Sequence, residues 1–269
     1  MALFDLLILG AIAGFTIYLG LPIARMRNVS PKFKGMLNSA AAGILLFLLI
    51  DIMSNAFEVT SGKFIDIISG TATLQSALIY LMLLVVGLLL GLLGLVWFEG
   101  RYILRQVNKE NISNELSESK AKRIAMMIAM GIGLHNFSEG LAIGQSYAGG
   151  AISLALLLVV GFGLHNATEG FGIAAPLSGF RPRRRFLALM GLIGGGPTFI
   201  GSIIGGFWVS QAISIFFLAL AAGAIIYVIK ELLYHGRIHG EGIKVMSSLI
   251  LGFFIGFGTD LIIKFASGA

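Results

Sequence analysis

Long apolar runs alternate with short polar segments along the whole chain. Eight of these runs are each close to the ~20 residues with which an α-helix crosses a bilayer. They cover residues 3–24, 36–57, 76–98, 124–146, 151–175, 186–208, 212–234 and 246–265. The fourth and fifth runs are joined by about four residues around Tyr147–Gly150, and the sixth and seventh meet as closely near Ser210. Since connections this short join antiparallel neighbours, the pattern predicts an all-α membrane protein with eight transmembrane helices.

No polar interval is long enough for a soluble domain. The longest, Glu99 to Lys122, holds about 24 residues of mixed charge, and we expect a loop there. The first apolar run is too long for the core of a signal peptide and lacks a small-residue cleavage pattern, so it is expected to be a true span. Residues 1–269 are therefore expected to form a single polytopic transmembrane domain.

Composition strengthens this interpretation. The chain is 57% hydrophobic and 12% charged, about half the charged fraction that is usual in a soluble domain. Its 37 glycines suit helices that approach each other closely in a membrane. There are no cysteines, which excludes disulfides, thiolate metal ligands and thiol nucleophiles.

The basic residues cluster on one side of the predicted membrane topology. Sixteen of the nineteen Lys and Arg residues lie in the first, third, fifth and seventh loops. They are Arg25, Arg27, Lys32, Lys34, Arg101, Arg105, Lys109, Lys120, Lys122, Arg123, Arg181, Arg183, Arg184, Arg185, Arg237 and Lys244. The positive-inside rule then places these loops in the cytoplasm and both termini outside the cell. This topology explains the basic pI, so nucleic acid is not an expected partner, and the run at 181–185 is expected to contact lipid headgroups.

One polar motif occurs twice within the apolar runs. GLHNFSEGLAIG covers Gly133–Gly144, and GLHNATEGFGIA covers Gly163–Ala174, thirty residues later. Because the two runs are antiparallel, the copies face each other in opposite chain directions. This arrangement is typical of the inverted repeats with which transporters build a site near the middle of the bilayer.

Helical geometry places the polar residues of each copy on one face. His and Glu at i and i+4 lie within roughly 40° of each other, and Asn at i+1 flanks the Glu. The candidate metal ligands are His135, Asn136, Glu139, His165, Asn166 and Glu169. Nitrogen and oxygen donors without sulfur suit a divalent transition metal, whose charge would neutralise the two glutamates. A single His–Glu pair could merely join two helices, but two registered copies favour a metal site.

At these residues the sequence resembles the ZIP family of zinc and iron transporters. That family carries an HN-x-P-E-G-like pattern on its fourth and fifth helices, within eight helices and with both termini outside. Ala41–Asp51 looks like the family's second helix and Leu218–Leu233 like its seventh, so the resemblance covers essentially the whole chain. It implies a first metal site formed by His135, Glu139, His165 and Glu169. Asn136 and Asn166, which share the two glutamates, would line an adjoining second site.

The sequence departs from the family pattern at three places. Ser138 and Thr168 replace the signature proline, so we expect Gly140 and Gly170 to allow any bend. Gly196 precedes Pro197 where many members carry a glutamate, which leaves the second site short of a carboxylate. The third loop contains no histidine, whereas a histidine-rich loop is usual in the family.

Other polar residues within the spans are secondary candidates. Asp51 and Glu231 could line the transport pathway or could hydrogen-bond neighbouring helices, and Asp51 could supply the carboxylate missing at Gly196. His235 and His239 are spaced i, i+4 at the cytoplasmic end of the seventh run and could receive metal at the exit, although interfacial histidines are common.

The sequence therefore predicts a divalent-metal transporter rather than an enzyme. Zn²⁺ uptake into the cytoplasm is the leading expectation, with Fe²⁺, Mn²⁺ or Cd²⁺ as other substrates and no organic cofactor. An intramembrane metal-dependent hydrolase would need an activating base beside an open coordination position, and no HExxH motif is present. A passive metal-selective channel stays open as an alternative. We expect a multi-pass protein of the cytoplasmic membrane, and a homodimer is one arrangement that the sequence allows.

Overall fold

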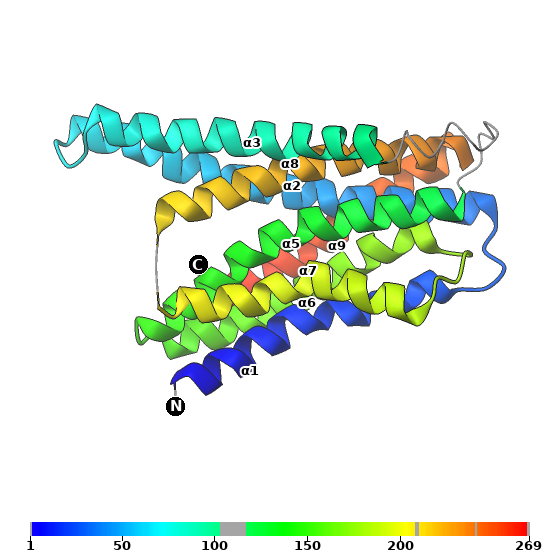
Figure 1. The fold of residues 1–269 in the computed structure, drawn as a ribbon, viewed down its shortest axis with the longest axis horizontal. Helices are drawn as coiled ribbons and strands as arrows, with labels where there is room; N and C mark the ends of the chain where they lie inside the picture. The colour runs from blue at the N-terminus through cyan, green and yellow to red at the C-terminus, as the bar shows by residue number, and fades with distance from the viewer. Residues whose placement is uncertain (1, 103–116, 208–209, 240, 268–269) are drawn as a thin grey trace.

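The computed structural model describes residues 2–102, 117–207, 210–239 and 241–267. Within these ranges the chain is helical and has no strands. The α-helices are α1 (Ala2–Phe15), α2 (Pro31–Ile68), α3 (Leu74–Tyr102), α5 (Glu118–Ala148), α6 (Ile152–Ala174), α7 (Arg184–Gly205), α8 (Gln211–His239) and α9 (Gly242–Ser267). Short 3-10 segments η1 (Thr16–Leu19), η2 (Leu21–Arg25) and η3 (Ala175–Leu177) extend α1 and α6. The helices run roughly parallel to one long axis (Figure 1).

Among the described residues, seven helical segments are long and apolar enough to cross a membrane. The remaining long helix, α5, has 31 residues, but His135, Asn136 and Glu139 lower its hydropathy. Each helix coincides with one of the runs predicted from sequence, so the all-helical membrane class is confirmed. The protein is a multi-pass membrane protein with a helical core.

Three predicted boundaries differ from the structure. The second run was expected to end at 57, but α2 continues to Ile68 and has 38 residues. The predicted loop at 99–122 is partly helical, since α3 extends to Tyr102 and α5 begins at Glu118; residues 103–116 lie outside the described part. The first run is not one regular helix, because Pro22 has no N–H to donate and the Thr16 hydroxyl donates to the carbonyl of Ala13 at 2.6 Å.

The helices pack as two groups. The first consists of α1, α5, α6 and α7, in which α5–α7 and α1–α7 make the most extensive contacts. The second consists of α2, α3, α8 and α9, in which α3–α8, α2–α9 and α2–α8 pack most closely. Figure 1 shows α2, α3 and α8 as one layer above the layer of α1, α6 and α7.

Glycines bring the backbones together inside the first group. Gly140 and Gly144 on α5 face Gly201 and Gly205 on α7, so a pair of small-xxx-small motifs meets across one helix pair. A Cβ at Gly140 would collide with the carbonyl oxygen of Thr198, and one at Gly144 with that of Ser202. The structure thus assigns Gly140 to close helix packing, whereas the sequence suggested a bend there.

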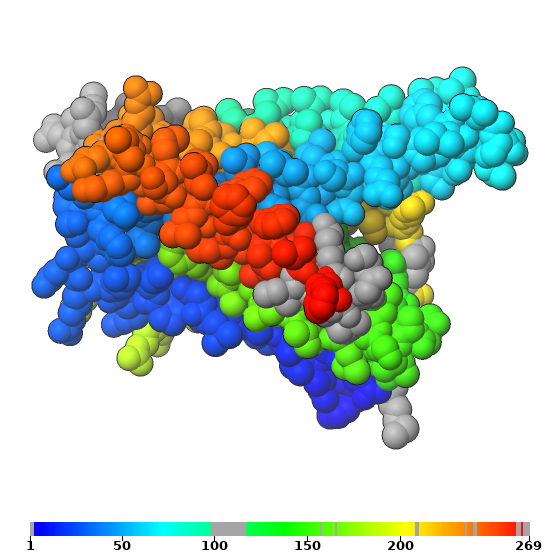
Figure 2. All heavy atoms as spheres, turned by 180° about the vertical axis from the view of Figure 1, so that it is seen from behind, coloured from blue at the N-terminus to red at the C-terminus, as the bar shows by residue number. Residues whose placement is uncertain are grey.

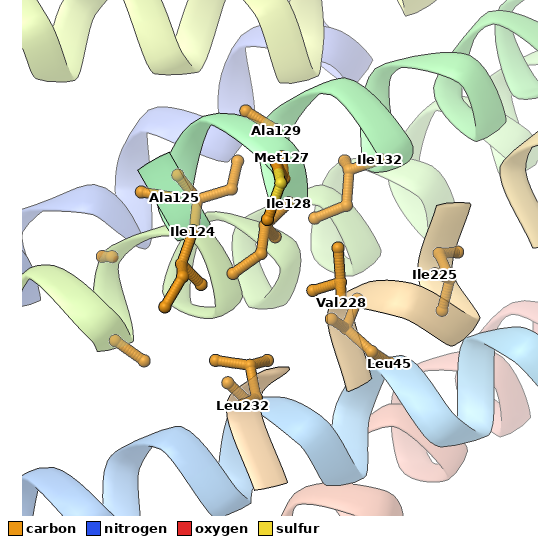
Figure 3. Packing of buried hydrophobic residues seen from close by; sticks show 14 of the residues in the cluster. Leu45, Ile124, Ala125, Met127, Ile128, Ala129, Ile132, Ile225, Val228 and Leu232 are labelled. Carbon is orange, nitrogen blue, oxygen red and sulfur yellow. The ribbon is translucent and has the colours of Figure 1, made fainter. Parts of the chain in front are cut away.

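The two groups meet through side chains instead of backbone. Figure 3 shows Ile128 and Ile132 of α5 beside Ile225, Val228 and Leu232 of α8 and Leu45 of α2. All of these belong to the main hydrophobic core. A Cβ at Gly131, where α5 passes Ala224 of α8, would find its nearest atom at 3.3 Å, a tight contact without a backbone collision. The interface between the groups is therefore an aliphatic surface.

The two ends of the bundle carry different connections. α1 begins and α9 ends at the same end of the bundle, where the α2–α3 turn extends beyond the other helices (Figure 1). Gly70 ends α2 with φ of 74°, and Thr71 N–H donates to the carbonyl of Asp66 at 2.9 Å, which is a Schellman ending. At the opposite end, Glu241 before α9 binds Lys32 of α2 at 2.6 Å and Lys244 at 2.9 Å. Hydrogen bonds from these two lysines lower the pKa of Glu241 to about 2.

Candidate metal site

A tight turn brings the two motif copies together. α5 ends at Ala148 and α6 begins at Ile152, as the spacing predicted. Gly150 has φ of 80°, a conformation that L side chains rarely adopt, and Ala151 N–H donates to the carbonyl of Ser146 at 2.9 Å. This ending reverses the chain within a few residues, so α6 returns antiparallel to α5.

Asn136 joins the two copies through hydrogen bonds. Its Nδ2 donates to Asn166 Oδ1 at 2.7 Å, to Glu169 Oε2 at 2.9 Å and to the carbonyl oxygen of Gly194 at 3.0 Å. All three partners are acceptors, so only the amide nitrogen can face them. Asn166 in turn donates to the carbonyl oxygen of Ala13 at 2.9 Å. The network therefore connects α5, α6, α7 and α1.

Two glutamates and a histidine lie at this network, and a third acid acts on two of them from α2. His135 and Glu139 are each 6% exposed and Glu169 is fully buried. His135 Nε2 lies 3.3 Å from Glu139 Oε1. The Glu139 carboxylate acts electrostatically on Glu169, and the Asp51 carboxylate of α2 acts on both His135 and Glu139. Carboxylates at such depth are costly unless a proton or a cation compensates them.

Two oxygen acceptors in the network have no hydrogen-bond donor among the described residues. They are Asn136 Oδ1 and Glu139 Oε2, and both are buried. Buried acceptors are normally paired, because leaving one unpaired costs about 1–3 kcal/mol. A desolvated divalent cation would satisfy oxygens of this kind, and oxygen and imidazole donors without thiolates fit a first-row ion.

The described side chains do not by themselves complete a metal shell. Among them, no group of three His, Asp or Glu residues is arranged to hold an ion. His165 lies on α6, four residues before Glu169, and its side chain is outside the described part of the chain. The fourth expected ligand is therefore not placed.

Comparison of the sequence with the profiles of known protein families gives a match. Residues 104–264, more than half of the sequence, match the profile of ZIP zinc transporters. The chain belongs to the ZIP zinc transporter family. The matched segment contains both motif copies. Members of the ZIP family are transporters, so this ZIP protein is a divalent-metal transporter and not a hydrolase. No curated protein matches the chain.

The other predicted residues of this ZIP protein lie on two helices, α8 and α2. Glu231 is buried on α8 and its Oε1 lies 2.6 Å from Nζ of the neighbouring Lys230. His235 and His239 lie in the last two turns of α8, and their side chains are outside the described part. Asp51, half-buried on α2, is the secondary candidate whose charge acts on the central residues.

The backbone acceptors at the site could not be predicted from the sequence. The carbonyl oxygen of Gly194 accepts a hydrogen bond from Asn136, and the carbonyl oxygen of Ala13 accepts one from Asn166. Pro197 also lacks the N–H that would pair with the carbonyl of Ile193, and that carbonyl faces Gly133 of α5. The run of three glycines before Pro197 was the available signal, because it lets α5 and α1 approach the α7 backbone.

Replacing Asn136 should distinguish a hydrogen-bond donor from a metal ligand. We expect Asn136→Ala to lower metal affinity by about 10–100-fold, since it removes the donor that orients Glu169. Asn136→Asp should lower it at least as much, because the new carboxylate has no donor and faces Glu169. Titration calorimetry with Cd²⁺ measures both, with Gln145→Ala on the same helix as the control. Unchanged or tighter binding by Asn136→Asp would contradict the donor role.

Proposed function

We propose that this ZIP protein carries Zn²⁺ into the cytoplasm through a site shared by α5 and α6. His135, Glu139, His165 and Glu169 are the proposed ligands. Asn136 and Asn166 contribute the adjoining position, and Asp51 supplies a carboxylate from α2. Fe²⁺, Mn²⁺ and Cd²⁺ have the same ligand chemistry and are further candidates as substrates.

One observation carries the proposal. Asn136 of the first motif copy is hydrogen-bonded to Asn166 and Glu169 of the second, so two segments thirty residues apart converge on one buried point. Glu139 and Glu169 interact electrostatically there, with Asp51 close by. A divalent ion would neutralise the two glutamates, whereas a purely structural junction between helices gains nothing from three neighbouring acids.

The proposed topology follows the positive-inside rule. It has eight spans, with α5 among them in spite of its polar motif, and an inverted relation between the two motif copies. Both termini then lie outside the cell, and the connections that hold most of the basic residues lie in the cytoplasm. On this basis Glu231, His235 and His239 of α8 form the cytoplasmic part of the pathway.

The proposed transport step is a movement of one helix group against the other. The group of α1, α5, α6 and α7 is joined by backbone contacts at glycines and hydrogen bonds at the site. Most of the interface with α8 and α2 consists of aliphatic side chains, which can slide past one another more easily than the glycine contacts within the first group. Entry of the metal displaces protons from the two glutamates, so uptake is coupled to proton release.

Uptake into proteoliposomes tests the transport function. We expect Glu139→Ala and Glu169→Ala each to lower the initial rate of Zn²⁺ uptake at least tenfold, because each removes a charged ligand. The control is Glu118→Ala, which removes an exposed glutamate of the same helix that pairs with Lys122 at 2.6 Å.

Wild-type flux in either site variant would contradict the proposed ligands. A rate that saturates with metal concentration and responds to a pH gradient indicates a carrier, whereas a non-saturating flux indicates a channel. Vesicles in which the chain is uniformly oriented give the direction.

A further inference from the structure

An apolar groove opens toward the lipid between both helix groups. It encloses about 410 Å³ and is lined by residues of η1, α2, α6 and α9. Phe33, Met36, Leu37, Ala40 and Ile44 form its α2 wall. Figure 2 shows the lime-green surface of α6 exposed between α9 in orange-red, α2 in blue and η1 in darker blue. The groove is thus a place where α6 can be reached from the membrane.

The length of the groove matches one acyl chain. From Phe33 to Ile44 the α2 wall rises by about 16 Å, at 1.5 Å per residue. Half of the hydrocarbon core of a bilayer is about 15 Å thick. Phe33 lies in the first turn of α2, so if α2 enters the bilayer there, the groove reaches from the membrane surface to about the middle of the bilayer.

A polar hollow with two arginines lies beside the mouth of the groove. Arg27, Asn28, Gly179 and Arg181 line it, and it encloses about 400 Å³. The two loops that form it are tied by a hydrogen bond from Arg25 to the carbonyl oxygen of Pro182 at 3.4 Å. No acid lines this hollow, so its charge suits a phosphate group.

Lys34 connects the hollow to the groove. Its side chain packs against Gly179, where an added Cβ would lie 2.7 Å from Lys34 Cε, and its Nζ lies 4.1 Å from the ring centre of Phe180. It also follows Phe33, the first residue of the groove. Lys32, on the other side of Phe33, is bound to Glu241 at 2.6 Å and is already neutralised. The positive charge at the mouth is therefore directed toward the hollow.

We propose that this is a binding site for one anionic phospholipid of the leaflet in which the α1–α2 connection lies. One acyl chain occupies the groove, and the phosphate is held by Arg27 and Arg181 with Lys34 beside them. Thr168 lines the groove and precedes Glu169, so the bound chain contacts the helix that carries half of the metal site. The site does not depend on the identity of the metal or on the direction of transport.

Native mass spectrometry of the full chain in detergent tests the headgroup half. Phosphatidylglycerol and phosphatidylcholine with identical chains are the probes. We expect tighter binding of phosphatidylglycerol, and a loss of about fivefold for each of Arg27→Gln and Arg181→Gln, the value of one basic residue at an anionic surface. Arg237→Gln, an exposed arginine at the end of α8, is the control and should change nothing.

The groove half is tested by filling it. Leu251 of α9 lines the groove and is 61% exposed, and Leu251→Trp should remove the bound lipid whatever its headgroup. Leu90→Trp, at a 53% exposed leucine of α3, should leave it bound. Equal Zn²⁺ binding by wild type and Leu251→Trp shows that the variant is folded, and it separates this site from the proposed metal function.

Four outcomes of the lipid-binding measurements would overturn the proposal. They are equal affinity for the two headgroups, no effect of the arginine substitutions, equal effects of the two tryptophans, and complete displacement of the lipid by inorganic phosphate. The last would assign the hollow to a free anion. A change of the monomer–dimer ratio in Leu251→Trp without loss of lipid would assign the groove to a second copy of the chain and would also overturn it.

Discussion

Glu139→Gln and Glu169→Gln should each abolish the rise in thermal stability that the metal gives the wild-type protein. A ligand at 100 times its dissociation constant stabilises the folded state by about 2.7 kcal/mol. Removing one of the two proposed carboxylate ligands should weaken binding at least ~100-fold, because even a group outside the coordination shell contributes 10–100-fold. At the same Zn²⁺ concentration, the stabilisation should then nearly vanish.

The same variants should be at least as stable as the wild type without metal. Glu139 and Glu169 are buried and act on each other, with Asp51 near Glu139, so a neutral amide relieves both desolvation and repulsion. Thermal unfolding with chelator and with Zn²⁺ measures the two effects in one experiment. Glu118→Gln is the matched control. Loss of stability in chelator would show instead that these glutamates support the fold.

Gly144→Ala should strongly destabilise the protein, although alanine is the better helix former. The new Cβ would collide with the backbone of α7 at Ser202, and backbone atoms cannot rotate away as a side chain does. Overpacking of this kind costs about 1–3 kcal/mol. Gly94→Ala on α3 has open space around its Cβ and should gain about 0.5–1 kcal/mol from helix propensity alone. Chemical or thermal unfolding of the two variants measures the difference.

Gly205→Ala on the facing helix extends the test. Its Cβ would collide with the carbonyl oxygen of Leu141, so it pushes α5 and α7 apart in the same way. We expect the Gly144→Ala, Gly205→Ala double variant to lose less stability than the two single losses combined, because one separation accommodates both methyl groups. Strict additivity would mean that the two glycines are not part of one helix contact.

Much of the fold could be predicted from the apolar runs, because a membrane-spanning helix must be apolar over about 20 residues. The ends of the helices were harder to predict than their existence. The second run stops at 57, before Glu58, but α2 continues through Glu58 to Ile68, since a helix can leave the hydrocarbon and stay helical. In the 3-10 part after Phe15, Gly20 lies against the α6 backbone, a contact that the sequence does not display.

The repeated motif predicted which helices meet, and the structure joins Asn136 to Asn166 and Glu169. What the motif could not show is how the amide is used. Residue identities do not show which backbone carbonyl, such as that of Gly194, will accept a side-chain hydrogen bond. Likewise, the electrostatic effect of the Asp51 carboxylate on His135 depends on how α2 packs, and no spacing along the chain encodes it.

The long α2–α3 hairpin gives the protein a natural reference point for measurements. It extends past the other helices and belongs to the helix group opposite α5 and α6 (Figure 1). Ile68 beside this turn is 89% exposed, so a fluorophore or an antibody epitope can be attached there without disturbing packing. A second probe on the α5–α6 turn at Gly149 would then report, by its distance from the first, how far α5 and α6 move in the proposed transport step.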